Sequence, residues 1–314
     1  MKKWLARHLI CPQCLPNEYF LELIIKTQNN TDIISGELGC PVCGQEYAID
    51  NGLAMMLPKE TKKRLSDDSG YNSKEMVSSY LWSHFCDLFK DPDATKAYKI
   101  WSSSFKNAGG IALDIGCSVG RLSFEMSRTH DRVIGIDTSQ SFIQKARQLL
   151  NRKRLDFDLI IEGRITQKRF IEFNNGWQYE RIEFLVADAM ALPFCKHFFS
   201  TIASINILEK VPDPLQHFIE INRVMAKTKA MFVFSDPFSW DKSVSSPDSW
   251  LSGKTQGKYK GRGIDNIAKI ISGLDQIIDP PMTVIEQQDV PWTIRKTQNL
   301  WEYINSQMII GIRP

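Results

Sequence analysis

The sequence predicts an α/β protein with a doubly wound, mostly parallel sheet of seven strands and a small N-terminal domain. Three observations indicate this fold class. From residue 109 onward, apolar runs of strand length alternate with helical patterns, as in parallel sheets covered by helices on both faces. The first run breaks into a glycine-containing turn, and the second ends in a carboxylate. Four of the seven cysteines form two Cys-x-x-Cys pairs near the N-terminus.

The N-terminal domain is predicted at residues 1–58 as an autonomous zinc ribbon. Two matched Cys-x-x-Cys pairs favour one tetrahedral Zn²⁺ over disulfides in a reduced cytosol, and two ordinary thiol pairs are the alternative. Strands are expected at 19–26 and 44–50, and Gly44 suits the positive φ that a metal-binding knuckle needs. A fold this small cannot bury enough core without its metal. The expected ligands are Cys11, Cys14, Cys40 and Cys43.

The second half of this domain carries a family resemblance. The run Cys40–Pro58 resembles the zinc-ribbon activator subunit of tRNA, rRNA and release-factor methyltransferases, and the small bacterial proteins related to that subunit. The resemblance implies a module that binds or shields a methyltransferase domain, here fused in the same chain. It leaves open whether the ribbon also recruits a protein partner.

Two segments separate the ribbon from the main domain. Residues 59–73 are polar and charged and are interpreted as a linker, with a phosphate contact through their basic cluster as the less favoured alternative. Residues 74–108 combine helical periodicity with many aromatic side chains. We therefore expect a helical cap that packs on the edge of the sheet.

The main domain is predicted at residues 109–314. Its segment 156–180 is longer than the fold requires, and no element is assigned there. Strands are expected at 111–115, 132–136, 182–187, 200–205, 230–235, 283–288 and 307–312.

The turn after the first of these strands is the most specific signal. Gly116 and Gly120 allow the backbone to approach a ligand, and Asp137 at the end of the next strand can accept hydrogen bonds from both ribose hydroxyls. Asp114 lies inside the first strand, which a dinucleotide fingerprint normally keeps apolar. In this the chain resembles the class I S-adenosylmethionine (AdoMet) methyltransferases. A capped turn and a helix N-cap are the alternative roles of these carboxylates.

This resemblance implies the fold of that family, with its last strand antiparallel beside the fifth, and AdoMet as cofactor. Asp188 would accept the adenine amino group, the Ala189 amide would address a ring nitrogen, and Asn206 would lie near the sulfonium. Ser118 replaces the middle glycine of the family turn and is a candidate partner of the methionine carboxylate. The helical cap would cover the cofactor. The expected cofactor-binding residues are Asp114, Gly116, Cys117, Ser118, Gly120, Asp137, Thr138, Asp188, Ala189 and Asn206, and candidates from the cap are Tyr71, Tyr80 and Trp82.

The methyl acceptor is addressed by a second resemblance. The runs Ser235–Trp240, Pro247–Gly253 and Val290–Lys296 resemble the methyltransferase domain of ovothiol synthases and, more distantly, the carnosine N-methyltransferases. This implies N-methylation of an imidazole, in a small molecule or in a histidine side chain. A loop with three aromatic residues would stack on the flat ring, with packing of the loop itself as the alternative. The candidate substrate-binding residues are Phe238, Trp240 and Trp250, and the candidate catalytic residues, as acceptors of the distal imidazole N–H, are Asn206 and Asp236.

Two other function classes remain as alternatives. An RNA base methyltransferase is one, because Lys254–Arg262 interleaves basic residues with an aromatic residue, although a Gly/Lys-rich lid explains that run as well. A non-catalytic AdoMet-binding partner protein is the other. The net charge of +3 is too small to indicate nucleic acid by itself. Neither a signal peptide nor an apolar run of membrane-spanning length is recognisable, so we expect a cytoplasmic protein without membrane contact.

Overall fold

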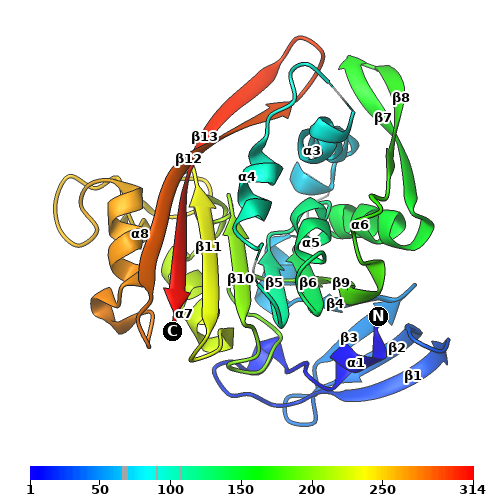
Figure 1. Cartoon of the computed structure of the whole chain (residues 1–314). Helices are drawn as coiled ribbons and strands as arrows, with labels where there is room; N and C mark the ends of the chain where they lie inside the picture. The colour runs from blue at the N-terminus through cyan, green and yellow to red at the C-terminus, as the bar shows by residue number, and fades with distance from the viewer. Residues whose placement is uncertain (66–69, 90, 107) are drawn as a thin grey trace.

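A single twisted sheet forms the centre of the computed structural model, which describes residues 1–65, 70–89, 91–106 and 108–314 (Figure 1). Within this described part, the sheet has eleven strands in the order β1-β2-β3-β4-β9-β6-β5-β10-β11-β13-β12. The strand bounds are β1 Glu22–Gln28, β2 Ile33–Gly39, β3 Glu46–Asp50, β4 Leu53–Met56, β5 Ile111–Ile115, β6 Arg132–Asp137, β9 Ile182–Ala187, β10 Thr201–Ile205, β11 Ala230–Asp236, β12 Thr283–Arg295 and β13 Trp301–Arg313.

The seven strands expected from the sequence are all present, so the predicted fold class is confirmed. Strands β9, β6, β5, β10 and β11 run parallel to one another. The last strand, β13, runs antiparallel between β11 and β12, as the methyltransferase resemblance implies. Strands β12 and β13 are longer than predicted, with 13 residues each, and their paired ends reach beyond the rest of the sheet (Figure 1).

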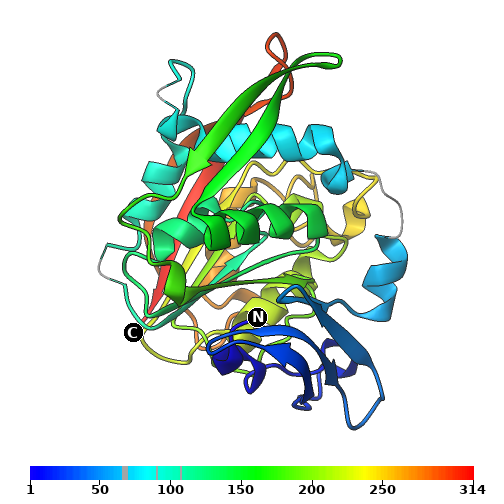
Figure 2. The same ribbon diagram turned by 90° about the vertical axis from the view of Figure 1, so that its right-hand side faces the viewer.

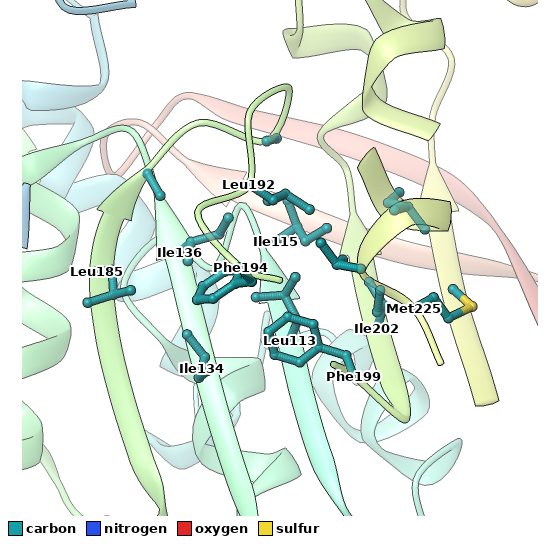
Figure 3. Packing of buried hydrophobic residues seen from close by; sticks show 14 of the residues in the cluster. Leu113, Ile115, Ile134, Ile136, Leu185, Leu192, Phe194, Phe199, Ile202 and Met225 are labelled. Carbon is teal, nitrogen blue, oxygen red and sulfur yellow. The ribbon is translucent and has the colours of Figure 1, made fainter. Parts of the chain in front are cut away.

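Helices cover both faces of the sheet (Figure 2). Because side chains alternate along a strand, Ala112 of β5 belongs to a buried cluster with Phe124 on one face. Leu113 belongs to the cluster on the other face, which includes Phe199 (Figure 3). No described helix has the length and apolarity needed to span a bilayer. The α-helices are α1 Lys3–Ala6, α2 Lys59–Arg64, α3 Lys74–Phe85, α4 Ala97–Ser103, α5 Arg121–Met126, α6 Gln140–Arg152, α7 Pro214–Val224 and α8 Gly263–Ile271. The 3₁₀ helices are η1 Pro12–Cys14, η2 Gly70–Asn72, η3 Cys86–Leu88, η4 Tyr179–Arg181, η5 Leu208–Lys210, η6 Pro247–Ser249 and η7 Leu274–Gln276.

The N-terminal ribbon is continuous with the central sheet. Its last strand, β4, pairs in parallel with β9, with Met55 opposite Val186 and Met56 opposite Ala187. The N-terminal amino group is buried and donates to the Ile33 carbonyl at 2.8 Å. The ribbon therefore differs from the autonomous domain expected from the sequence, because its backbone groups cover the edge of β9 that would otherwise be unpaired.

The linker predicted at residues 59–73 is partly helical. Residues Lys59–Arg64 form α2, and Thr61 in its middle is buried. The charged composition suggested a solvated segment, but Thr61 and Arg64 of this helix donate hydrogen bonds to the buried carboxylate of Asp188. Residues 66–69 of the predicted linker lie outside the described residues.

A two-stranded hairpin occupies most of the segment to which no element was assigned. Strand β7 (Arg154–Glu162) pairs antiparallel with β8 (Ile165–Glu172), separate from the main sheet. Ser78 of α3 fixes it in place, because its hydroxyl donates to the Asp158 carbonyl and accepts from the Ile160 amide. Helices α3 and α4 lie in the segment predicted as a helical cap, and residues 90 and 107 of that range lie outside the described residues.

Candidate cofactor and acceptor site

A cavity of about 350 Å³ opens at the carboxyl ends of the central parallel strands. In open α/β sheets this edge, where the strand order reverses, is the usual place for a ligand. Its lining brings together nine of the ten residues predicted to bind a cofactor. They are Asp114, Gly116, Cys117, Ser118, Asp137, Thr138, Asp188, Ala189 and Asn206.

Gly120, the tenth residue, does not line the cavity. It stands at the start of α5 with φ of 84°, and a Cβ there would come within 2.7 Å of the Phe184 ring. The missing side chain lets α5 pack closely on the sheet, so the predicted cofactor contact of Gly120 is corrected to a packing role. Gly116, with φ of 71°, does line the cavity, and a Cβ there would collide with Ile207.

Asp137 organises the turn that faces the cavity. Its carboxylate accepts hydrogen bonds from the Ser118 amide at 3.0 Å and from the Ser139 amide at 2.8 Å. Burial raises its pKa to about 6, against the opposing effect of these amides. Each carboxylate oxygen keeps a lone pair, so Asp137 can hold the backbone and still accept from a ligand hydroxyl.

Asp114 lies at the bottom of the same region. The Ser123 hydroxyl donates to its carboxylate at 2.6 Å, and burial raises its pKa to about 7. Ser118 has φ of 50°, and its buried hydroxyl oxygen has no hydrogen-bond partner among the described residues. A buried polar atom without a partner is costly, so this hydroxyl is poised for a ligand group.

Asp188 is already surrounded by donors from the N-terminal part of the chain. One carboxylate oxygen accepts from the Met190 amide at 2.9 Å. The other accepts from the Thr61 hydroxyl at 2.5 Å and from the Arg64 guanidinium at 3.2 Å. Arg64 and Leu65 also line the cavity. Helix α2 therefore closes the end of the site at which the sequence predicts adenine.

Asn206 lies at the end of β10 in an uncommon backbone conformation, with φ of 55°. Its amide N–H donates to the Ser235 carbonyl at 2.7 Å, and its side-chain oxygen accepts from the Ser306 hydroxyl at 2.7 Å. The side-chain nitrogen is buried and has no partner among the residues that the structure describes. A residue held by both main chain and side chain, with one amide donor left over, suits a ligand contact.

The other predicted acceptor group, Asp236, is not part of the lining. Its carboxylate is fully buried and accepts from the Leu208 and Phe238 amides. Burial raises its pKa to about 8, and the nearby Glu209 carboxylate adds to this. Asp236 thus organises the two loops that follow β10 and β11, and its predicted contact with the acceptor is corrected.

The aromatic residues predicted to bind substrate lie outside the cavity as well. The rings of Trp240 and Trp250 stack on each other, with centroids 5.8 Å apart and planes at 14°. Their N–H groups donate to Ser252 and Ser245 in the same loop. The Phe238 ring packs closely over Gly263 of α8. The structure favours the packing role for all three, because the two indole N–H groups are satisfied within the loop and the Phe238 ring packs on α8.

Other aromatic side chains, from several distant elements, form the wall of the cavity. Tyr80 stacks on Phe142 with ring centroids 4.9 Å apart, and Trp101 contacts Trp292 edge to face at 6.2 Å. Trp82 is buried elsewhere, against Trp301. Six aromatic rings line the described part of the cavity: Tyr71, Tyr80, Tyr98, Trp101, Phe142 and Trp292. Trp292 lies in one of the three runs singled out in the sequence, whereas Tyr98 and Trp101 were known only as aromatic residues of the predicted helical cap.

His84 is the functional candidate that the sequence did not reveal, because a single histidine in a helix has no motif. It lines the cavity and is 5% exposed. Its Nδ1 is hydrogen-bonded to the Tyr98 hydroxyl at 2.5 Å, while its Nε2 is buried without a partner in the described part of the chain. Burial, with the nearby Arg121 charge, lowers its pKa to about 3, so the ring is neutral.

The four cysteines of the two pairs converge on one point. Their sulfur atoms all lie within 4.8 Å of one another, and two of the separations are 3.7 and 3.8 Å. Tetrahedral Zn²⁺ with Zn–S bonds of about 2.3 Å requires separations of about 3.8 Å, so the donor set fits zinc. Gly44 has the predicted positive φ, 68°. Between the ligands of the first pair, Gln13 accepts from the Lys59 amide at 2.8 Å and so links the knuckle to α2.

Comparison with known proteins agrees with this site. Residues 113–233 match the protein family described as a methyltransferase domain. The match begins inside β5 and ends inside β11, and it therefore includes the glycine turn, Asp137, Asp188 and Asn206. The family match supports an AdoMet-dependent methyltransferase. No curated protein matches the chain.

Several solved structures are similar in fold. A SAM-dependent methyltransferase from Methanosarcina mazei has 17% identity and a TM-score of 0.43, over 67% of this chain and 95% of that one. The N-methyltransferase NodS from Bradyrhizobium japonicum, in complex with S-adenosyl-L-homocysteine, has 14% identity and a TM-score of 0.41, over 69% and 84%. A chain in the Haloferax volcanii complex that contains the Trm112 methyltransferase activator has 15% identity and a TM-score of 0.43, over 75% and 97%. At these values the similarities do not bear on substrate or partner.

Proposed function

We propose that this protein is an AdoMet-dependent methyltransferase that methylates a nitrogen of a small, flat, imidazole-like acceptor or of a histidine side chain. One observation carries the proposal. A single cavity at the carboxyl edge of the sheet is lined by one set of carboxylates and unpaired polar atoms and by a second set of six aromatic rings. The first set suits a nucleoside with an amino-acid tail, and the second suits a planar ring.

The chain's own residues would divide the work as follows. Asp137 accepts from the ribose hydroxyls, Ala189 donates its amide to the adenine ring, and Ser118 donates to the methionine carboxylate. Bound AdoMet supplies an activated methyl group on sulfur. Such a transfer needs little acid–base help, because alignment of the nucleophile and exclusion of water lower most of the barrier. The aromatic wall supplies both, since it is rigid and carries little polar surface.

Asp188 is the proposed partner of the adenine amino group, but it differs from the other cofactor residues. Its carboxylate already accepts from Thr61, Arg64 and Met190. An oxygen with a remaining lone pair can accept one further N–H, so the adenine contact would be shared with α2. The four cysteines would hold a structural Zn²⁺ that takes no part in the chemistry.

Two measurements test the proposal in order. Calorimetric titration should show AdoMet binding, and absence of binding would remove the methyltransferase assignment. The protein is then incubated with methyl-labelled AdoMet and separately with imidazole, L-histidine, a histidine-containing peptide and total RNA. Label in an azole or in histidine supports the proposed acceptor. Label in RNA alone would favour the base-methylating alternative, and AdoMet binding without label in any sample would favour a non-catalytic partner.

A further inference from the structure

We infer that the aromatic side of the cavity is the acceptor subsite, and that His84 Nε2 positions the acceptor by accepting a hydrogen bond from its ring N–H. This inference rests on the proposed function and assigns the acceptor to a chemical class, a neutral azole with one N–H and one free ring nitrogen. His84 is a positioning residue here.

The first step is the unsatisfied nitrogen of His84. The proposed role assigns the Nδ1–H tautomer to the neutral ring, in which Nδ1 donates to the Tyr98 oxygen and Nε2 is left as the acceptor. This bond also fixes the plane of the ring. Its Nε2 is buried and has no partner among the described residues, although the side chain forms part of the cavity wall. A buried histidine nitrogen without a partner costs free energy, and a ligand N–H in the cavity would recover it.

The second step is the shape of the space beside it. The His84 ring lies 5.7 Å from the Trp292 ring at a steep angle, and 5.4 Å from the Tyr80 ring. Trp101 completes the wall, and its indole N–H is also buried without a partner. Flat walls with few polar atoms select a planar, weakly hydrated ligand.

The third step is charge. The two cationic side chains of the described lining are each paired with a carboxylate, Arg64 with Asp188 at 3.2 Å and Lys210 with Glu209 at 2.8 Å. His84 is neutral because burial lowers its pKa to about 3. An anionic acceptor therefore finds no unpaired cation in this lining, whereas a neutral ring needs none.

The fourth step connects this subsite to the residue expected near the sulfonium. The Ser306 hydroxyl donates to Asn206 at 2.7 Å, and Ser306 pairs across the strands with Val290. Trp292 is two residues further along β12, so its side chain lies on the same face as that of Val290. The aromatic wall is thus linked to Asn206 through Ser306 and Val290.

The chemical step balances without another reactant. The free ring nitrogen forms the new N–CH₃ bond as the S–CH₃ bond breaks, and the electron pair of that bond stays on sulfur. The ring then carries the positive charge that the sulfonium lost. Its N–H proton leaves to water after release, because His84 is too weak a base to retain it.

The experiment compares two probes in the protein saturated with S-adenosylhomocysteine. Imidazole has the ring N–H, whereas thiazole keeps the planar ring and its nitrogen but lacks that donor. The wild-type protein should bind imidazole about tenfold more tightly than thiazole, the effect of one good hydrogen bond. His84→Leu should abolish this preference, and His84→Gln, which places an amide oxygen near the position of Nε2, should restore most of it.

His130→Leu is the matched control, since His130 is also buried with an unpaired Nε2 but does not line the cavity. It should keep the preference for imidazole, and thermal melting checks that each variant folds. Two results would overturn the inference: an unchanged preference in folded His84→Leu samples, or AdoMet affinity reduced as much as imidazole affinity. Failure of wild-type protein to bind either azole would exclude the azole class, and failure to bind AdoMet would instead remove the proposed function.

Discussion

The two sides of the cavity are built in different ways. The side proposed for the cofactor uses short segments at the tips of adjacent strands, and each segment is a continuous motif in the chain. The side proposed for the acceptor uses single side chains from η2, α3, α4, α6 and β12, which are distant in sequence. The difference shows why a donor is easier to recognise in such a protein than an acceptor. The donor site is local, and the acceptor site exists only after folding.

Zinc removal should have the largest effect on stability, and it should also weaken binding of the cofactor. Structural zinc contributes on the order of 10 kcal/mol to the folding of small ribbons. Strand β4 pairs with β9, and Gln13 holds the start of α2, whose Thr61 contacts Asp188. Chelation should therefore release zinc, lower the melting temperature and weaken AdoMet binding in calorimetry, all restored by added zinc. A metal-free protein with normal melting would contradict the zinc site.

Asp137→Ala should weaken AdoMet binding by about a hundredfold, because it removes the proposed ribose acceptor and frees the two amides that hold the turn. Calorimetry measures the affinity. Asp156→Ala, which changes an exposed carboxylate on the β7–β8 hairpin, is the control and should bind AdoMet normally. Equal affinities in the two variants would refute the ribose assignment.

Trp292→Ala should affect binding of the acceptor much more than binding of AdoMet. Loss of this ring should raise the KM for the acceptor by about twentyfold, because a stacking wall and the exclusion of water are lost together. AdoMet affinity should change less than threefold. Trp240→Ala is the matched control, since its ring packs in a loop outside the cavity. If the two variants have the same acceptor KM, the aromatic wall does not bind the acceptor.

Lowering the pH should weaken AdoMet binding, with a smaller effect than the substitutions above. Burial raises the pKa of Asp137 to about 6, so in the ligand-free protein this group becomes neutral as the pH falls through 6. A neutral carboxyl group is the poorer acceptor for ribose hydroxyls, and AdoMet affinity should fall by about fivefold between pH 6 and pH 5. Calorimetry across this range tests the sign, and affinity that is constant or rises in acid would contradict it.

Much of the main domain was predictable because its signals are local. The apolar run 111–115 and the turn that follows require only neighbouring residues, and their strand and positive-φ glycines are as expected. The ribbon could not be placed in the same way. The charged segment that follows it resembles a solvated linker in composition, whereas in the structure this segment begins with a helix whose Thr61 and Arg64 contact Asp188.

The aromatic residues show that a position in the chain close to the site does not ensure contact with the cavity. Trp240 and Trp250 follow the end of a strand that leads to the site, so their position in the chain suggested a ligand contact. In the structure they stack on each other, and Trp292 takes the place expected of them in the cavity wall.

The sequence by itself determined the class of fold, the two cysteine pairs that form one cluster and the acidic strand ends of the proposed cofactor side. Strand periodicity, glycine turns and the spacing of the cysteine pairs each depend on a short continuous segment, so each can be recognised without the rest of the chain. Only the tertiary structure decided that the ribbon extends the sheet, that α2 contacts Asp188 and that His84 faces an aromatic cavity. These contacts join residues far apart in the chain, and their partners are selected by packing in three dimensions.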